Sequence, residues 1–207
     1  KMKNIAILTG GDSAEYDISI LSANTVLQHL NPELFKGYII HLKDDKFTAL
    51  INDEKINLDK NNFTFKLENK TISFDAVFMA LHGPPAENGE IQPYFDKLNI
   101  PYTSCNAKVS ALTFDKYKCN TKLKQLGFNC AQSYMYAKGN EIDIDTIVDT
   151  VGLPCFVKPN GAGSSHGISK VKQESELSSA INHALEHDDK VLIEQFIDGT
   201  EVSSGVF

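Results

Sequence analysis

The sequence predicts an α/β protein with a buried parallel strand in its first half and a second unit of alternating strands and helices in its second half. Strand-like and helix-like segments alternate along the chain, which is the order found in α/β proteins. The run 76–81 is apolar at every position, as expected of a parallel strand buried on both faces. Within 174–186 the apolar residues recur at helical spacing.

The first half contains three main predicted strands, and two of them end in glycine-containing turns. Such turns matter because ligands in open α/β sheets gather beyond the carboxyl ends of the strands. The predicted elements, in order, are a strand 4–8, the turn 9–13, an amphipathic helix reaching Leu30, a strand 37–42, short strands and turns over 44–74, the strand 76–81 and a helix 91–98.

A second unit is predicted to start near residue 104, again with helices and strands in alternation. Gly127 is a plausible helix stop, since glycine adopts the left-handed conformation that ends many helices. The predicted elements are a helix 113–126, strands 154–157 and 168–171, a helix 174–186, a strand 191–196 and a strand that begins within 200–207.

Composition and net charge exclude several classes of protein and of binding site. The 207 residues are 42% hydrophobic, enough for one large domain or two small ones. A formal net charge of −7 argues against a general nucleic-acid binder, which usually needs a basic face. No apolar run reaches the roughly 18 residues of a membrane span. The four cysteines form no Cys-x-x-Cys pair, so we expect reduced thiols in the cytoplasm and neither a disulfide framework nor a zinc site.

The most informative motif is the glycine- and serine-rich loop 160–167, which follows the strand 154–157. Its small residues let backbone N–H groups approach an anion closely, and Lys158 adds a positive charge beside it. The motif therefore indicates a phosphate site, although such loops also occur as plain turns. The candidate residues in the loop are Gly161, Gly163, Ser164 and Ser165.

Several charged residues have both a functional and an ordinary interpretation. Glu15 suits a substrate ammonium, or it stabilises the dipole of the helix that follows. His82 is either a polar site residue or a histidine bonded to nearby backbone. Lys116 begins a helix, where a cation is unfavourable unless it reaches an anion, or it is solvated. Glu194 and Glu201 suit sugar hydroxyls or an exocyclic amine, or are also solvated.

The order of these motifs resembles the D-alanine–D-alanine ligase family of the ATP-grasp superfamily, from the first strand to the end of the chain. The resemblance implies an N-terminal parallel-sheet, Rossmann-like (pre-ATP-grasp) domain over 1–103, the small α+β subdomain of an ATP-grasp fold over 104–197 and the start of a truncated large subdomain over 198–207. The residues that carry it are Gly10–Ser19, His82-Gly83 with Glu87–Gln92, Ile100–Thr103, Ser110–Leu112 with Asp115-Lys116, Lys158–Gly167, and Glu194 with Gly199–Glu201.

The resemblance implies that ATP phosphorylates one D-alanine and that the amine of a second attacks the acyl phosphate to give D-alanyl-D-alanine for peptidoglycan synthesis. Glu15 would hold the first ammonium, with His82 and Glu87 nearby and Ser164 closing the glycine loop. The implied nucleotide residues are Lys116 and Lys158 for the phosphates, Glu194 with the backbone of Gln195, Phe196 and Ile197 for adenine, and Glu201 for ribose. A homodimer in the cytoplasm is also implied.

Two departures from the family pattern qualify this expectation. Ala86-Glu87-Asn88-Gly89 stands where the family has Gly-Glu-Asp-Gly, and the chain contains no arginine. The ligands for Mg²⁺, or for Mn²⁺ as an alternative, are expected beyond residue 207, so the chain is expected to be inactive alone. The alternatives are a D-alanyl-D-lactate ligase, another ATP-grasp ligase or a non-catalytic nucleotide-binding module.

Overall fold

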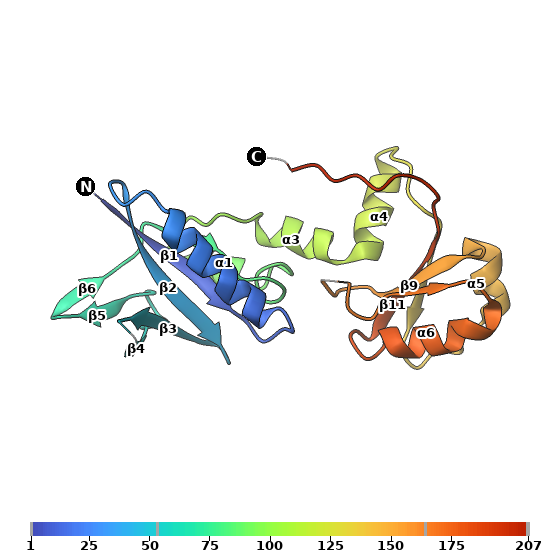
Figure 1. The fold of residues 1–207 in the computed structure, drawn as a ribbon, viewed down its shortest axis with the longest axis horizontal. Coiled ribbons are helices and arrows are strands. Elements are labelled where there is room, and N and C mark those ends of the chain that lie inside the picture. The colour runs from blue at the N-terminus through green and yellow to red at the C-terminus, as the bar shows by residue number, and fades with distance from the viewer. Residues whose placement is uncertain (1, 53, 164, 206–207) are drawn as a thin grey trace. The chain divides into compact units, whose positions relative to one another are not determined.

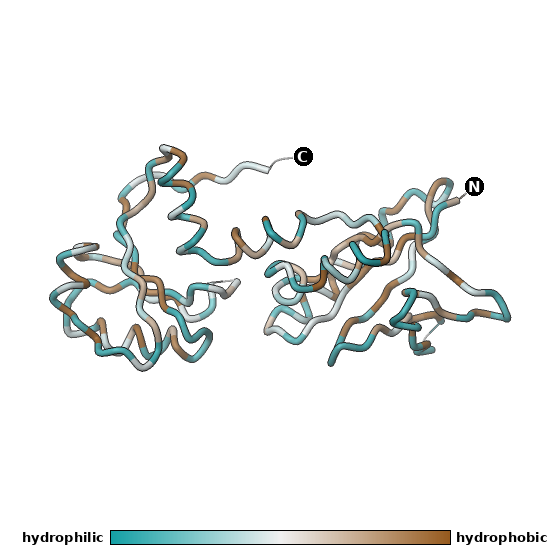
Figure 2. Tube along the Cα trace, turned by 180° about the vertical axis from the view of Figure 1, so that it is seen from behind, coloured by the Kyte–Doolittle hydropathy of each residue, from teal (hydrophilic) through white to brown (hydrophobic). Residues whose placement is uncertain are grey.

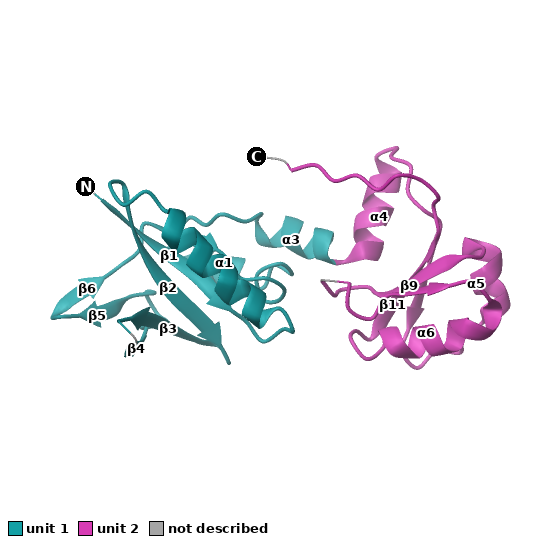
Figure 3. Ribbon diagram, viewed as in Figure 1, with its two compact units in different colours: residues 1–114 teal, residues 115–207 magenta. Residues whose placement is uncertain are grey.

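The structure, a computed structural model, describes residues 2–52, 54–163 and 165–205. It divides into two compact units, residues 1–114 and residues 115–207 (Figure 3). The predicted division at 103/104 differs from this, because residues 104–114 and their helix α3 (Ala107–Phe114) belong to the first unit. The expected third domain at 198–207 stays a prediction.

The first unit is built on a five-stranded sheet with the order β4-β3-β2-β1-β7 (Figure 1). The central strand β1 pairs in parallel with both β2 and β7, which confirms the predicted parallel sheet. Strands β3 and β4 extend it as antiparallel neighbours. The strands are β1 Lys3–Gly10, β2 Phe35–Lys43, β3 Lys46–Ile51, β4 Glu54–Asn57 and β7 Ala76–Met79, with β5 Phe65–Leu67 and β6 Lys70–Ile72 forming a separate pair.

Both faces of β1 are buried, because its successive side chains point to opposite sides of the sheet. Ile5 and Ile7 pack in one cluster with Ala23 of helix α1 (Tyr16–His29), which covers this face in Figure 1. Leu8 packs in the other cluster with Phe95 of helix α2 (Gln92–Leu98). This burial on both faces explains why β1 is apolar at successive positions from Ile5 to Leu8.

The second unit is a four-stranded antiparallel sheet with the order β10-β9-β11-β8, which confirms the predicted α+β unit. One face carries Val157, Val191 and Ile193, which pack with residues of α5 and α6. The elements are helix α4 Lys116–Gln125, β8 Ser133–Ala137, α5 Ile144–Val151, β9 Cys155–Pro159, β10 Ser169–Val171, a 3-10 turn Glu174–Glu176, α6 Leu177–Ala184 and β11 Lys190–Gln195.

The predicted single helix 113–126 is wrong, because the chain forms two helices that meet at Asp115. Asp115 is extended (φ −81°, ψ 97°), and its carboxylate accepts a hydrogen bond from the backbone N–H of Lys118 at 3.0 Å. This is an N-cap, so α4 starts anew after α3. The aspartate before Lys116 is the signal that marks this boundary.

Three further differences concern strands and one helix. The segment 128–153, for which we predicted no element, contains β8 and α5; Asp143 caps α5 by accepting from the Thr146 N–H at 3.0 Å. The strand expected within 200–207 is not formed over the described residues 200–205. Strand β7 ends at Met79, two residues before the predicted end, although the next two residues are still buried.

Hydropathy along the chain agrees with this architecture. Figure 2 shows hydrophobic residues recurring along the strands of both sheets. Within the described part of the chain, no helix combines the length and the apolar character needed to cross a bilayer.

We predict that Leu8→Ala lowers the free energy of unfolding by about 2–5 kcal/mol, because Leu8 is 0% exposed at the centre of the sheet and its removal leaves a cavity. Leu34→Ala is the control; this side chain is 56% exposed, and its loss should cost about 0.5 kcal/mol or less. Urea titration of the chain followed by circular dichroism measures both. Equal losses would contradict the central position of β1.

Candidate functional site

The first cluster of polar side chains, called here the edge cluster, consists of Ser13, Glu15, Ser19, Ser22 and His82. It lies where β1 and β7 end. These two strands are parallel neighbours, with Leu8 opposite Met79, so the segments that follow them leave the same edge of the sheet. This is the edge where ligands of parallel sheets gather.

His82 is held by side chains from two other segments. Its backbone N–H donates to Ser19 Oγ at 2.9 Å, and its ring Nε2 lies 2.8 Å from Ser22 Oγ. Ser13 Oγ donates to the His82 carbonyl at 3.4 Å. The other ring nitrogen, Nδ1, lies 3.8 Å from a carboxylate oxygen of Glu87. The ring therefore bonds to a serine hydroxyl of α1, and its second nitrogen faces an acid.

Glu15 is tied into the same cluster through its backbone. Its N–H donates to Ser13 Oγ at 3.2 Å, and its carbonyl accepts from Ser19 Oγ at 3.0 Å. Among the described residues its side chain makes no capping hydrogen bond to α1, although Glu15 stands at the N-cap position. The half-buried carboxylate instead lies close to Gly83, since a Cβ built there would be 3.0 Å from Glu15 Oε2.

A cavity of about 370 Å³ opens beside this cluster. His82 and Glu87 contribute the charged and titratable groups of its lining. The remaining lining residues are small or apolar: Met79, Leu81, Ala86, Thr103, Ser104, Cys105, Ser110, Thr113 and Phe114. The space is large enough for a small polar molecule, and its lining offers the imidazole of His82 from the edge cluster and the carboxylate of Glu87.

The second cluster of charged side chains is called here the lysine cluster and is built around Lys158 and Glu194. It lies on the face of the second sheet that is opposite the hydrophobic core of this unit. Lys158 of β9 pairs with Leu192 of β11, so Lys158, Leu192 and Glu194 point to one side, away from the core residues Val157 and Ile193. The alternation of the strands thus places charge on one face and apolar packing on the other.

Glu194 has a hydrogen-bond partner at each carboxylate oxygen. Lys158 Nζ lies 2.5 Å from Oε2, and Asn120 Nδ2 of α4 donates to Oε1 at 2.6 Å. Both members of the ion pair are mostly buried, with side-chain exposures of 20% and 14%. The predicted role of Glu194 toward an adenine is untested; the structure shows a carboxylate that orients the lysine.

Lys116 reaches the same glycine-rich loop from α4. Its Nζ donates to the carbonyls of Ala162 at 2.5 Å and Asn160 at 3.3 Å. Burial and the positive charge of Lys158 lower the pKa of the Lys116 ammonium, and nearby carboxylates offset this only in part. The Lys116 ammonium thus bonds two carbonyls of the loop in surroundings that disfavour its charge.

The glycine-rich loop is anchored at its first residues. The side-chain oxygen of the buried Asn160 accepts from the Tyr117 N–H at 2.9 Å, which fixes the loop to α4. The Gly161 N–H donates to Asp188 Oδ2 at 2.6 Å. Gly163 accepts from the His166 N–H at 3.4 Å, and the exposed Ser165 has a φ of +57°. Ser164 lies outside the described residues, so its predicted role stays a prediction.

The predicted nucleotide residues after Glu194 lie at and beyond the end of β11. Gln195 closes the strand, and its N–H donates to the Gln132 carbonyl at 2.9 Å. The half-buried Phe196 ring lies 5.9 Å from the Phe156 ring and accepts the Lys170 ammonium at 3.5 Å from its centroid. Ile197 is 65% exposed, and Glu201 is exposed outside any helix or strand; their roles toward a nucleotide are untested.

Sequence reasoning missed the residues that hold these groups in place. Ser19 and Ser22 lie on α1 three residues apart, and that spacing on a helix facing a turn was the available signal. No comparable local signal marks Asn120, Asn160 or Asp188, because their partners lie 74, 43 and 27 residues away in sequence.

Comparison with protein-family models finds two matches that together span most of the chain. Residues 4–105 match the model described as D-ala D-ala ligase N-terminus, and residues 121–207 match the one described as D-ala D-ala ligase C-terminus. The chain is also 48% identical over 206 residues to the D-alanine--D-alanine ligase of Flavobacterium johnsoniae, covering 99% of this chain and 64% of that relative.

Solved structures agree in fold. The VanG D-Ala:D-Ser ligase from Enterococcus faecalis superposes with a TM-score of 0.83 at 29% identity, covering 96% of this chain and 64% of that one. The D-alanine--D-alanine ligase from Bacillus anthracis complexed with ATP superposes with a TM-score of 0.75 at 26% identity, covering 95% and 60%. The chain thus spans less than two thirds of the length of these relatives.

We predict that Gly83→Ala destabilises the chain by at least about 1 kcal/mol more than Gly139→Ala, because crowding in a packed region costs roughly 1–3 kcal/mol. Gly83 has a φ of +73°, and its new Cβ would lie 2.8 Å from Ser13 Oγ. Gly139 is matched for backbone, with a φ of +91°, but no described atom lies within 4 Å of its Cβ position. Urea unfolding measures the difference. If both variants lose the same stability, the close packing of Gly83 against the edge cluster is refuted.

Proposed function

The chain belongs to the D-alanine–D-alanine ligase family, and from that premise we propose that it forms the substrate-side and nucleotide-side units of an enzyme that joins two D-alanines with consumption of ATP. The product, D-alanyl-D-alanine, serves peptidoglycan precursor synthesis. The observation that carries the proposal is the placement of Lys116 and Lys158 beside one glycine-rich loop, because this arrangement favours a polyphosphate.

In the proposed reaction, a carboxylate oxygen of the first D-alanine attacks the γ-phosphorus of ATP and ADP leaves. The amine of the second D-alanine then attacks the acyl carbon of the acyl phosphate, phosphate leaves and the amine loses a proton. Phosphoryl transfer of this kind is accelerated mainly by positioning and by neutralisation of charge. The residues of this chain supply both, and none of them forms a covalent bond with a substrate.

Glu15 binds the ammonium of the first D-alanine in this proposal. A carboxylate pairs with an ammonium by charge-assisted hydrogen bonds and repels the phosphates of ATP. Ser13 and Ser19 support the assignment, since their bonds to the Glu15 backbone fix where its side chain starts. His82 and Glu87 line the neighbouring cavity and bind the same substrate. Ser164, which lies outside the described residues, keeps its predicted role of closing the glycine-rich loop.

Lys116 and Lys158 bind the phosphates of ATP. Burial and the charge of Lys158 lower the pKa of Lys116, and an anion beside the two ammonium groups opposes both effects, so anion binding favours the charged form of Lys116. Gly161, Gly163 and Ser165 contribute the loop around the phosphates. The end of β11 binds the nucleoside, with Glu194, Gln195, Phe196 and Ile197 at the adenine and Glu201 at the ribose.

Magnesium, or manganese in its place, accompanies ATP in the proposed enzyme and would neutralise phosphate charge. The carboxylates nearest the loop do not fit as its ligands. Glu194 bonds Lys158 and Asn120, and Asp188 accepts from the Gly161 and Lys190 N–H groups. A hard cation needs carboxylate oxygens that are open to it. Neither Glu194 nor Asp188 is therefore proposed as a metal ligand.

The proposed enzyme is a cytoplasmic homodimer. Ile18 and Leu21 support a second copy, because they are 53% and 63% exposed and lie one turn apart on α1. All four cysteines are free thiols, which agrees with a reducing compartment. The similarity to a D-Ala:D-Ser ligase keeps D-serine as a second candidate for the attacking amine, while the higher identity to D-alanine--D-alanine ligases favours D-alanine.

We predict that Glu15→Gln lowers kcat/KM for the first D-alanine about tenfold or more, because a charged hydrogen bond is worth about 1.5–3 kcal/mol. The Kd of an ATP analogue should hardly change. ADP formation is measured at varied D-alanine, in a protein that carries this sequence at the full length of its relatives.

The matched control is Asp17→Asn, which removes another acid from the first turn of α1. A loss of helix-dipole stabilisation alone costs about 0.3–1 kcal/mol of stability and leaves the kinetics normal. If Glu15→Gln behaves like Asp17→Asn, or if it loses ATP affinity, Glu15 does not bind the ammonium.

We predict that Lys116→Met weakens binding of a non-hydrolysable ATP analogue about tenfold or more, whereas Lys122→Met on the same helix leaves the affinity unchanged. Lys122 is exposed, and Lys116 contacts the loop. The affinity of the unmodified chain should also fall as the pH rises toward 10.5, the ordinary pKa of lysine, because Lys116 loses its proton at a lower pH. Calorimetric titration at several alkaline pH values measures both effects. An unaltered pH dependence in Lys116→Met would exclude this lysine from the phosphate site.

A further inference from the structure

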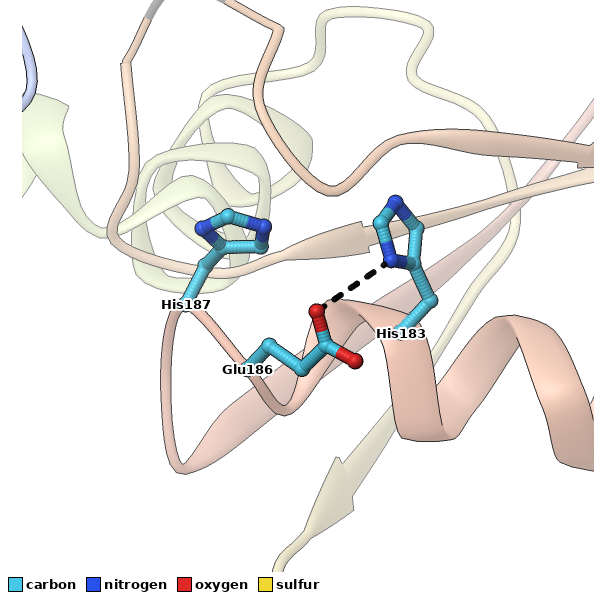
Figure 4. Close-up of side chains that lie close together, drawn as sticks. All are labelled: His183, Glu186 and His187. Atoms are coloured by element: carbon cyan, nitrogen blue, oxygen red, sulfur yellow. Dashed lines mark ion pairs between the residues drawn. The ribbon is translucent and has the colours of Figure 1, made fainter.

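Three metal-ligating side chains meet at the end of α6, and none of them is among the residues assigned above to a substrate or nucleotide. They are His183, Glu186 and His187, and all three are exposed (Figure 4). One ligand atom from each lies within 4.8 Å of the other two. The closest pair is His183 Nδ1 and Glu186 Oε2, at 3.6 Å. Figure 4 shows both imidazole rings and the carboxylate on the same side of this turn.

The spacing explains why they meet. Residues three and four apart share one face of a helix, and the helical turn continues past α6, since the His187 N–H donates to the Ala184 carbonyl at 3.1 Å. Ligand atoms of a tetrahedral ion with bonds of about 2.0–2.1 Å lie roughly 3.3 Å apart. His183 and Glu186 are exposed, so rotation of these two side chains toward the His187 ring, which packs against Gly167, shortens the remaining distance.

The donor set selects a class of metal. Two imidazole nitrogens and one carboxylate oxygen suit zinc and its neighbours nickel, cobalt and copper, whereas magnesium prefers sites made of oxygen. A site of this composition is therefore separate from the magnesium that accompanies ATP. Three protein ligands also leave one tetrahedral position open to water or to a further side chain.

The cluster lies at the base of the glycine-rich loop. The His187 ring packs against Gly167, where an added Cβ would come within 2.5 Å of His187 Cδ2. The His166 ring lies 6.2 Å from the His187 ring, centroid to centroid. Asp188, the next residue, accepts the Gly161 N–H. The segment that carries two ligands thus contacts the loop at both of its ends.

We propose that His183, Glu186 and His187 bind one divalent transition-metal ion of the zinc class, and that the bound ion stiffens the base of the glycine-rich loop. Fixing His187 and its neighbour Asp188 limits the motion of the backbone at Gly167 and Gly161, which these two residues contact. The site and its effect involve neither D-alanine nor ATP, so this inference stands independently of the proposed ligase activity.

The test uses the untagged 207-residue chain, freed of metal with a chelator, because a histidine tag would bind the same ions. Zinc is titrated against a competing coloured chelator, and cobalt serves as a spectroscopic probe of tetrahedral coordination. His183→Gln and His187→Gln keep size and polarity but remove a ligand nitrogen, and Glu186→Gln removes the charge. His29→Gln is the matched control, an exposed histidine in the last turn of α1. Circular dichroism verifies that every variant is folded.

We expect one zinc per chain, with affinity reduced at least about tenfold in each histidine variant, a smaller loss in Glu186→Gln and none in His29→Gln. Hydrogen exchange of residues 160–167 should slow when zinc is added to the unmodified chain and stay unchanged in His187→Gln. Equal zinc affinity in the unmodified chain and His183→Gln, or no binding by the unmodified chain, overturns the site. Binding without slower exchange in the loop overturns the coupling.

Discussion

The parallel pairing of β1 with both β2 and β7 is the constraint on which the first unit depends. It buries β1 on both faces, and it makes the segments after β1 and β7 leave the sheet at one edge. Glu15 and His82, 67 positions apart by their numbers, reach one cluster for that reason. Helix α1 then supplies Ser19 and Ser22 from a single face, so sheet and helix together position the histidine.

In the second unit the corresponding constraint is that side chains of the antiparallel sheet point alternately to two faces, of which only one packs against helices. One face of β9 and β11 packs its apolar residues Cys155, Val157, Val191 and Ile193 against helices, which frees the other face to carry Lys158 and Glu194. Helix α4 completes that face with Asn120 and Lys116. Its position depends on Asn160, whose buried side chain bonds the first turn of α4. The buried side-chain amide of Asn160, a residue of the loop, thus helps to position the helix that carries Lys116.

Most of the fold was predictable because its signals are local. Continuous apolar strands, the helical spacing in 177–185 and the glycines after strands all act over a few residues, and those elements are confirmed. The break at Asp115 was missed because an aspartate inside an apparently continuous helix was not interpreted as a cap. The sequence pointed to the charged residues of the two clusters and to the glycines and serines of the loop, whose functional roles stay predictions, but not to the side chains that hold them in place. Asn160 and Asp188 have no local signature, because each is defined by a hydrogen-bond partner far away in sequence. The His183-x-x-Glu186-His187 spacing, in contrast, is a local pattern that indicates neighbouring ligands on one helical face.

The hydrogen bond from Gly161 to Asp188 has a consequence for how the loop discriminates among anions. The carboxylate occupies a backbone N–H that an anion would use, and Glu194 does the same to the Lys158 ammonium. A ligand that engages these donors exchanges one charge-assisted bond for another, and only the difference between the two contributes to its affinity. A small singly charged ion gains little from such an exchange. In the proposed enzyme, a polyphosphate would displace both carboxylates at once with several charges, so these internal competitors would make the loop select against small, singly charged anions.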